Sequence, residues 1–211
     1  MPWARRGHKA VVVASRGRQM IGRIEPQHFL ETTCLQGQES QAALPGTVPD
    51  PPAVLHITPA TWKAGAALHR VHLDVYAAQM FNPGIQGNAR FSPIVTAAGL
   101  PIPTLYGGSS FHCAVMETVF HDVPFTPRLK TYAKHRLERR QHSVLVPSAA
   151  LTLADLLNVP LRKLGVERKQ LIDTEKDTGG QIRKWAAAID AQHARIQGLC
   201  GRRGRTTAPC R

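Results

Sequence analysis

Four residues between positions 70 and 117 carry side chains suited to a polar cleft: Arg70, Arg90, Tyr106 and Glu117. Glu117 lies in an otherwise apolar segment with helical character, where a carboxylate is costly unless it is paired or faces a cleft. Each residue alone has a simpler explanation, because an isolated glutamate commonly faces solvent or forms a structural pair, a tyrosine commonly fills a core, and an arginine is commonly a surface cation. Their combination indicates a site.

A zinc site is the first alternative for the same segment. Cys113, Glu117 and His121 recur at four-residue intervals, on one face of a helix, with His112 nearby. The spacing matches no established zinc signature, and a glutamate and a histidine one turn apart commonly form only a hydrogen bond. We therefore expect no metal ligand here.

Short strands and one helix are expected to position these residues. Alternating or β-branched patterns predict three strands, at 68–72, 90–94 and 104–106. The polar run 107–110 ends the third strand and supplies an N-cap for a helix from residue 111 to about residue 121. Arg70 and Arg90 would then lie on strands, Tyr106 at a strand end and Glu117 on the helix.

Beyond residue 127 the pattern predicts one buried strand and two helices. Residues 127–140 are basic and irregular, whereas 142–146 is rich in β-branched residues. Two helices are predicted, a short one at 151–157 and a longer one at 181–194. The longer one places four apolar residues at helical spacing: Ile182, Trp185, Ala186 and Ile189. The predicted fold class is α+β, a small mixed sheet with packed helices.

The two ends of the chain differ from its middle. Residues 1–55 are polar and basic without sustained periodicity and close in a proline-rich linker, so we expect a poorly ordered arm. Residues 56–199 form the predicted domain, and 200–211 an atypical tail that contains arginine and cysteine.

The formal net charge of +13 would favour nucleic-acid binding if it were spread over the folded part. Ten of the 27 basic residues lie within 1–23 and 202–211, which contain no acidic residue. The rest of the chain contains 17 basic and 14 acidic residues, so the predicted domain is near neutral. A non-catalytic protein that binds nucleic acid or a partner through basic arms is therefore the alternative function.

The cellular setting follows from the cysteines and the N-terminus. The four cysteines show neither a CxxC pair nor the spacing of a disulfide framework, which fits a reducing cytoplasm. The apolar run at 10–14 is too short for a secretory signal, although an arginine-rich start is also compatible with a mitochondrial transit segment. No stretch is long and apolar enough to predict a membrane span.

Four short motifs in this order resemble the RES-domain family. They are Leu68-His-Arg70, Ala89-Arg-Phe91, Leu105-Tyr-Gly107 and Ala114-Val-Met-Glu117. The resemblance covers roughly residues 60–199, and although each motif is short, their order and spacing together are fairly specific.

The resemblance implies an ADP-ribosyltransferase-like fold and an NAD-consuming toxin of a toxin–antitoxin pair. NAD would be the substrate, with no prosthetic group, and an Xre-type antitoxin the partner, in a complex that could contain a toxin homodimer. The expected catalytic residues are Glu117 beside the ribose, Arg90 and Tyr106. NAD would be bound by guanidinium groups on its phosphates, by an aromatic ring on nicotinamide and by the polar loop: Arg70, Arg90, Tyr106 and Ser109.

The chain departs from the family pattern after Leu199. Where the family continues with an aromatic-x-Ser-Arg segment and further strands, this chain has Cys200 and an arginine-rich end. The expectation from this departure is a missing active-site serine, an unpaired sheet edge and weakened or lost activity.

Overall fold

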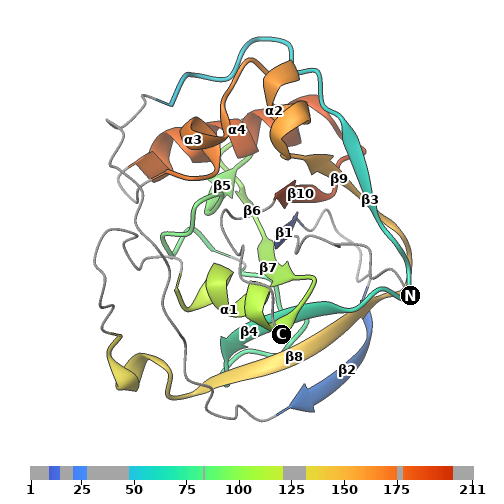
Figure 1. Ribbon diagram of the computed structural model, residues 1–211, viewed down its shortest axis with the longest axis vertical. Helices are drawn as coiled ribbons and strands as arrows, with labels where there is room; N and C mark the ends of the chain where they lie inside the picture. Colours follow the sequence, from blue (N-terminus) through green and yellow to red (C-terminus); the bar gives the residue numbers. More distant parts are fainter. Residues whose placement is uncertain are drawn as a thin grey trace, which may run out of the picture.

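An eight-stranded mixed sheet forms the centre of the protein in the computed structural model (Figure 1). The structure describes residues 48–82, 84–120, 132–174 and 178–201, and the backbone of 10–14 and 21–27. In order across the sheet, the strands are β2 (Ile21–Gln27), β8 (Arg140–Pro147), β4 (Leu68–Leu73), β7 (Thr104–Gly108), β1 (Ala10–Ala14), β10 (Gly198–Gly201), β9 (Leu151–Asp155) and β3 (Pro59–Trp62). Strands β9 and β10 pair in parallel, whereas the other described pairs are antiparallel. The α+β class is confirmed, with a wider sheet than predicted.

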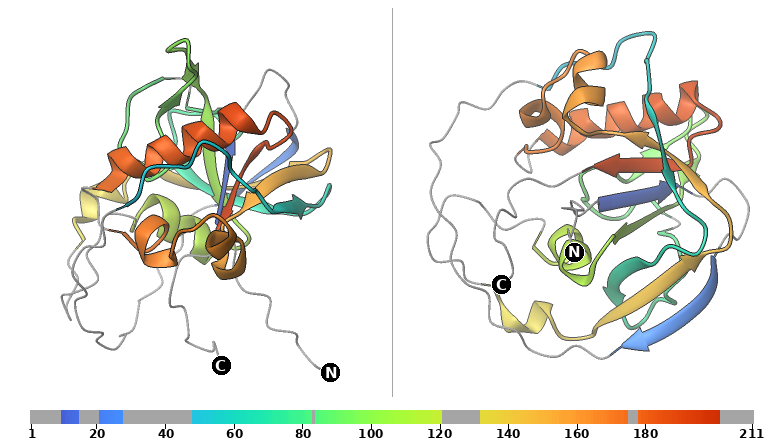
Figure 2. Two further views of the ribbon diagram at one scale, coloured as in Figure 1. Left: turned by 90° about the horizontal axis from the view of Figure 1, so that it is seen from above. Right: turned by 45° about the vertical axis from the view of Figure 1, so that its right-hand side comes forward.

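Helices cover the sheet at two places. Helix α1 (Phe111–Thr118) lies against β4 and β7, and α4 (Gly179–Gln192) crosses the opposite end of the molecule beside the short helices α2 (Asn158–Lys163) and α3 (Arg168–Leu171) (Figures 1 and 2). Two minor elements, the ladder of β5 (Ile94–Val95) with β6 (Pro101–Ile102) and the 3-10 turn η1 (Lys134–Arg136), complete the described structure. The candidate site residues lie on or beside β7 and α1.

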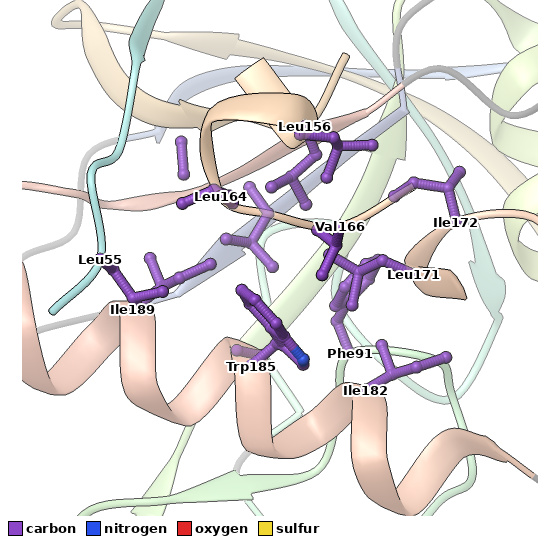
Figure 3. Packing of buried hydrophobic residues seen from close by; sticks show 14 of the residues in the cluster. Leu55, Phe91, Leu156, Leu164, Val166, Leu171, Ile172, Ile182, Trp185 and Ile189 are labelled. Carbon is purple, nitrogen blue, oxygen red and sulfur yellow. The ribbon is translucent and has the colours of Figure 1, made fainter. Parts of the chain in front are cut away.

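The largest apolar cluster lies beneath α4. All four apolar residues predicted to form the stripe of this helix are buried, and Trp185 lies at the centre of the packing (Figure 3). Residues of α2, α3 and the turn before β5 pack against the stripe, including Leu161, Leu171 and Phe91. The predicted helix at 181–194 is confirmed, and it fixes the segment from which Arg90 extends.

The proline-rich segment before β3 packs on α4. Trp185 donates from its indole nitrogen to the carbonyl of Pro49 at 2.7 Å, and the amide of Leu55 donates to the side chain of Gln192 at 2.9 Å. Val48 and Leu55 are themselves buried. The structure therefore differs from the expectation of a poorly ordered arm up to residue 55, because these apolar side chains find partners on α4.

Two strands also lie inside the range that was expected to lack regular structure. β2 pairs with β8 at one edge of the sheet, and β1 pairs with both β7 and β10. At the other end of the chain, β10 runs two residues into the predicted tail and has a strand on each side. The expectation of an unpaired edge after residue 199 is therefore wrong for β10.

Two further predictions were wrong. Residues 90–93 do not form a strand, and β5 begins only at Ile94. Pro93 has no amide hydrogen to donate to a ladder, and Ala89 and Ser92 make only an isolated bridge. Residues 151–157 begin with β9 rather than a helix. The alternation of buried Leu151 and Leu153 fits a strand that has neighbours on both sides.

Three strand predictions and one helix prediction near the site agree with the structure. The predicted strands at 68–72, 104–106 and 142–146 are present as β4, β7 and β8. The helix begins at Phe111 as expected, with Ser110 as its N-cap, and ends at Thr118 rather than near residue 121. The basic residues at 127–131 lie outside the described part of the chain.

Candidate active site

Glu117 occupies the last turn of α1 at the margin of the helix's packed face. Residues 113–115 of the helix are buried against the sheet, and Glu117 follows Cys113 by four positions and Ala114 by three. Glu117 is itself half-buried. The helix thus holds the carboxylate beside the apolar layer over β4 and β7 instead of directing it fully into water.

Tyr106 is the central residue of β7 and carries the clearest electrostatic signature of the site. Its hydroxyl accepts a hydrogen bond from the amide of Phe91 at 3.1 Å and also hydrogen bonds with Ser92. Burial raises the pKa of Tyr106 to about 12; the negative charge of Glu117 adds to this rise, whereas the positive charge of Arg90 opposes it. Arg90 and Glu117 therefore lie near enough to Tyr106 for their charges to influence its pKa, although burial and the hydrogen bonds of the hydroxyl influence it more.

Arg90 precedes the Phe91 turn and reaches towards the end of α3. One terminal nitrogen, Nη1, donates to the carbonyl of Ile172 and, at 2.8 Å, to the hydroxyl of Thr174. The other, Nη2, donates to the carbonyl of Thr174 at 3.3 Å. These bonds hold the guanidinium in a fixed orientation. A fixed orientation is what a guanidinium needs in order to bind an anion through two matched hydrogen bonds.

Arg70 lies on the other face of the sheet. In the pairing of β4 with β7, His69 is opposite Gly108, which places Arg70 opposite Gly107, whereas Tyr106 points to the face that α1 covers. Two observations agree with this register: a Cβ added at Gly107 would meet Leu68, and one added at Gly108 would meet Cys113 of α1. The structure therefore does not bring Arg70 together with the other three residues, because successive residues of a strand point to opposite faces.

The surroundings of Arg70 are polar and buried. Its Nη1 donates to the carbonyl of Ala78, and burial lowers its pKa to about 10. On the same face, Nε2 of His72 lies 2.9 Å from the hydroxyl of Ser143, and burial lowers the pKa of His72. Within the described residues no carboxylate forms an ion pair with Arg70.

The loop between β7 and α1 has a structural role that the sequence predicts. The hydroxyl of Ser110 accepts from the amide of Cys113 at 3.2 Å, as an N-cap does. Ser109 lies half-buried immediately before this cap. Its predicted contact with NAD stays a prediction.

A pocket lies beneath α4, beside the candidate site but not within it. It has a volume of about 20 Å³, room for about one water molecule, and is lined by Phe91, Ile94, Thr104, Ala186, Ile189, Asp190, Ile196, Gly198 and Leu199. The lining includes none of the four candidate residues. This pocket is too small for a dinucleotide.

Comparison with known proteins gives one match. A family model described as the RES domain matches residues 41–202, which is more than half of the chain. The chain belongs to the RES-domain family. Neither the curated proteins nor the solved structures that were searched include a match.

The RES match spans the turn, strand and helix that carry Arg90, Tyr106 and Glu117, and it begins before the predicted domain boundary at residue 56. Thr174 and the amide of Phe91 are neighbours of the site that the sequence reasoning did not assign a role. Thr174 lies within the range of the resemblance but outside its four motifs, and no sequence signal marks a backbone amide as a partner of Tyr106.

The zinc site and the binding of nucleic acid through basic arms both depend on residues that the structure does not describe. His121, the third residue of the suggested zinc set, is one of them, and among the described residues no group of three metal-binding side chains comes together. All but one of the basic residues in the two arms also lie outside the described residues. Among the described helices, none has both the length and the apolar character needed to cross a bilayer.

Proposed function

We propose that this RES-domain protein is an enzyme that consumes NAD by breaking the bond between nicotinamide and ribose, as a toxin of a toxin–antitoxin pair. Membership of the family supports an NAD-related activity. The observation that carries the proposal is that the matched RES domain contains Arg90, Tyr106 and Glu117, and that the charges of Arg90 and Glu117 both influence the pKa of Tyr106. A group whose pKa is strongly perturbed by burial and that lies within the influence of charged side chains is a candidate for a functional site.

In the proposed reaction, the bond from ribose C1′ to the nicotinamide nitrogen breaks and its electron pair leaves with neutral nicotinamide. The sugar gains oxocarbenium character, which the carboxylate of Glu117 stabilises through its negative charge and through a hydrogen bond from a ribose hydroxyl. An acceptor oxygen from water, phosphate or a protein side chain then bonds to C1′ and loses its proton to solvent.

Arg90 is proposed to bind the pyrophosphate of NAD. A guanidinium stays charged at any working pH and matches the geometry of phosphate oxygens. Its bonds to Ile172 and Thr174 would orient it before the substrate arrives, which lowers the entropy lost on binding. Tyr106 would place its ring beside nicotinamide, with its hydroxyl held by the amide of Phe91.

A contact between Arg70 and NAD is supported by the family resemblance alone. This contact is proposed only because the resemblance implies it, since the sheet register puts Arg70 on the opposite face from Tyr106. The Xre-type antitoxin, a homodimer in that complex, a cytoplasmic setting and an ADP-ribosyltransferase-like arrangement are proposals of the same kind.

The proposal is tested by NAD turnover in Glu117→Gln, which keeps the size of the side chain and removes its charge. We expect the rate to fall by about 100-fold or more, because the charge acts only as the transition state forms. Glu138→Gln is the matched control, since Glu138 is exposed beside η1.

The comparison separates catalysis from folding. Both variants should keep the thermal midpoint of the parent within a few degrees, and the control should keep its turnover. Equal NAD turnover in Glu117→Gln and in the parent would remove Glu117 from the mechanism.

A further inference from the structure

Strand β1 lies between two strands of the RES domain, although it is outside the part of the chain that the family model matches. The match begins at residue 41, whereas β1 spans Ala10–Ala14. Its neighbours β7 and β10 both lie inside the matched range. In Figures 1 and 2, β1 is the dark blue strand between them.

Backbone pairing shows what β1 contributes. Its residues pair with Thr104–Gly108 of β7 on one side and with Gly198–Gly201 of β10 on the other. Without β1, both of these strands would present unpaired amide and carbonyl groups in the middle of the sheet, and each buried group left without a partner is costly.

The sequence of β1 fits this central position. Ala-Val-Val-Val-Ala is an apolar run without alternation, which is typical of a strand that is covered on both faces. The flanking strands have such cover, because Leu105 and Cys200 belong to one apolar cluster and Tyr106 and Leu199 pack in another. By register, residue 11 lies opposite Cys200 and residue 12 opposite Leu199. An apolar sequence at 10–14 is thus what a strand between these two apolar layers requires.

We infer that β7 and β10 form a strand-binding slot in the RES domain and that residues 10–14 of the same chain fill it. The recognition is that of β-strand addition: main-chain hydrogen bonds provide affinity, and an extended apolar segment provides the fit. Residue 12 pairs with Tyr106, so occupation of the slot fixes the strand that carries the central residue of the candidate site. This inference goes beyond the proposed function and does not depend on it.

A disulfide in the full chain tests the slot directly. Val11→Cys puts a thiol opposite the native Cys200, at a Cα separation that antiparallel pairing keeps within disulfide range. Val12→Cys is the matched control, because residue 12 is in register with Leu199 and successive residues of a strand alternate between the two faces. After oxidation with glutathione disulfide, peptide mass spectrometry should find the 11–200 link in most molecules of the first variant. The control should form at least tenfold less of the link between residues 12 and 200.

Equal linkage in the two variants, or no 11–200 link, would overturn the inference. A second measurement uses Val12→Pro in the full chain, because proline removes an amide hydrogen from the strand. We expect its thermal midpoint to fall by roughly 5 °C or more, and a synthetic peptide of residues 8–16 to restore it, whereas the same peptide with proline at position 12 should not. An unchanged midpoint would also contradict the slot, whatever the NAD activity of the protein.

Discussion

At the scale of single residues, Tyr106 connects the site to the core. Its hydroxyl accepts from the amide of Phe91, which is buried beneath α4, while Glu117 and Arg90 act on the same group. The phenol is therefore neutral at physiological pH, and it serves as a hydrogen-bonding group and an aromatic surface instead of a base. Its ionisation belongs to the alkaline range.

This raised pKa predicts a pH-dependent stability. The folded protein keeps the phenolic proton up to about pH 12, whereas the unfolded chain releases it near the ordinary value of 10.0. Tyr106 should therefore contribute its full share to the free energy of unfolding below pH 10. This contribution should fall as the pH rises towards 12. Tyr106→Phe cannot ionise and should lack this contribution.

Urea denaturation of both proteins at several pH values between 8 and 11 measures the difference. At pH 8 the variant should be less stable by about 1 kcal/mol, because the amide of Phe91 loses its acceptor. Above pH 10 the gap between the two proteins should narrow. A gap that stays constant over the whole range would show that Tyr106 ionises as readily in the folded protein as in the unfolded one.

The types of the site residues could be predicted from the sequence, but their grouping could be predicted only in part. The motifs around Arg90, Tyr106 and Glu117 indicate one site, and in the structure the charges of Arg90 and Glu117 both influence the pKa of Tyr106. Arg70 was expected beside them, yet one step of register in β4 decides which face a residue occupies. The anchoring of Arg90 by Thr174 joins residues 84 positions apart, and no local pattern predicts such a contact.

At the scale of elements, the close packing of α1 on β7 positions Glu117. Gly108 permits this approach: a Cβ there would lie 2.7 Å from Cβ of Cys113 and 2.8 Å from the backbone nitrogen of Ala114. Real Cβ atoms do not come so close, so a larger residue would push the helix away from the strand. The glycine thus controls the distance between Glu117 and the sheet.

Gly108→Ala is therefore expected to destabilise the protein by roughly 1 to 3 kcal/mol and to lower NAD turnover together with stability. Gly180→Ala is the matched control, because a Cβ at Gly180 meets nothing within 4 Å and the residue lies in the first turn of α4. That change should be neutral or stabilising by up to about 1 kcal/mol. Chemical denaturation measures both, and equal stability of the two variants would contradict the close approach.

Elements with a local signature were predicted well, whereas those that depend on distant partners were not. The α4 helix has a periodic apolar stripe, and β8 a dense β-branched run, so both were found. β9 was mistaken for a helix because its strand character comes from pairing with β3 and β10. β1 was missed for a similar reason, because its short apolar run forms a strand by pairing with β7 and β10.

At the scale of the whole molecule, the formal charge gives little guidance to function. Most of the positive excess belongs to the two ends of the chain, while the matched RES domain contains the carboxylate, phenol and guanidinium of the candidate site. The fold depends on segments far apart in sequence. β1 and β10 pair in the middle of the sheet, and the segment 48–55 packs on α4 and is hydrogen-bonded to it. We expect catalysis and stability to be linked through these contacts.

Release of nicotinamide from NAD by the purified full-length protein tests the central claim most directly. With NAD alone, and with phosphate or a protein acceptor added, mass spectrometry should detect nicotinamide in an amount equal to the NAD consumed, together with a product that carries the ADP-ribose group. The identity of that product distinguishes hydrolysis, phosphorolysis and protein modification. NAD that stays intact under every condition, with no nicotinamide released by the folded protein, would contradict the account.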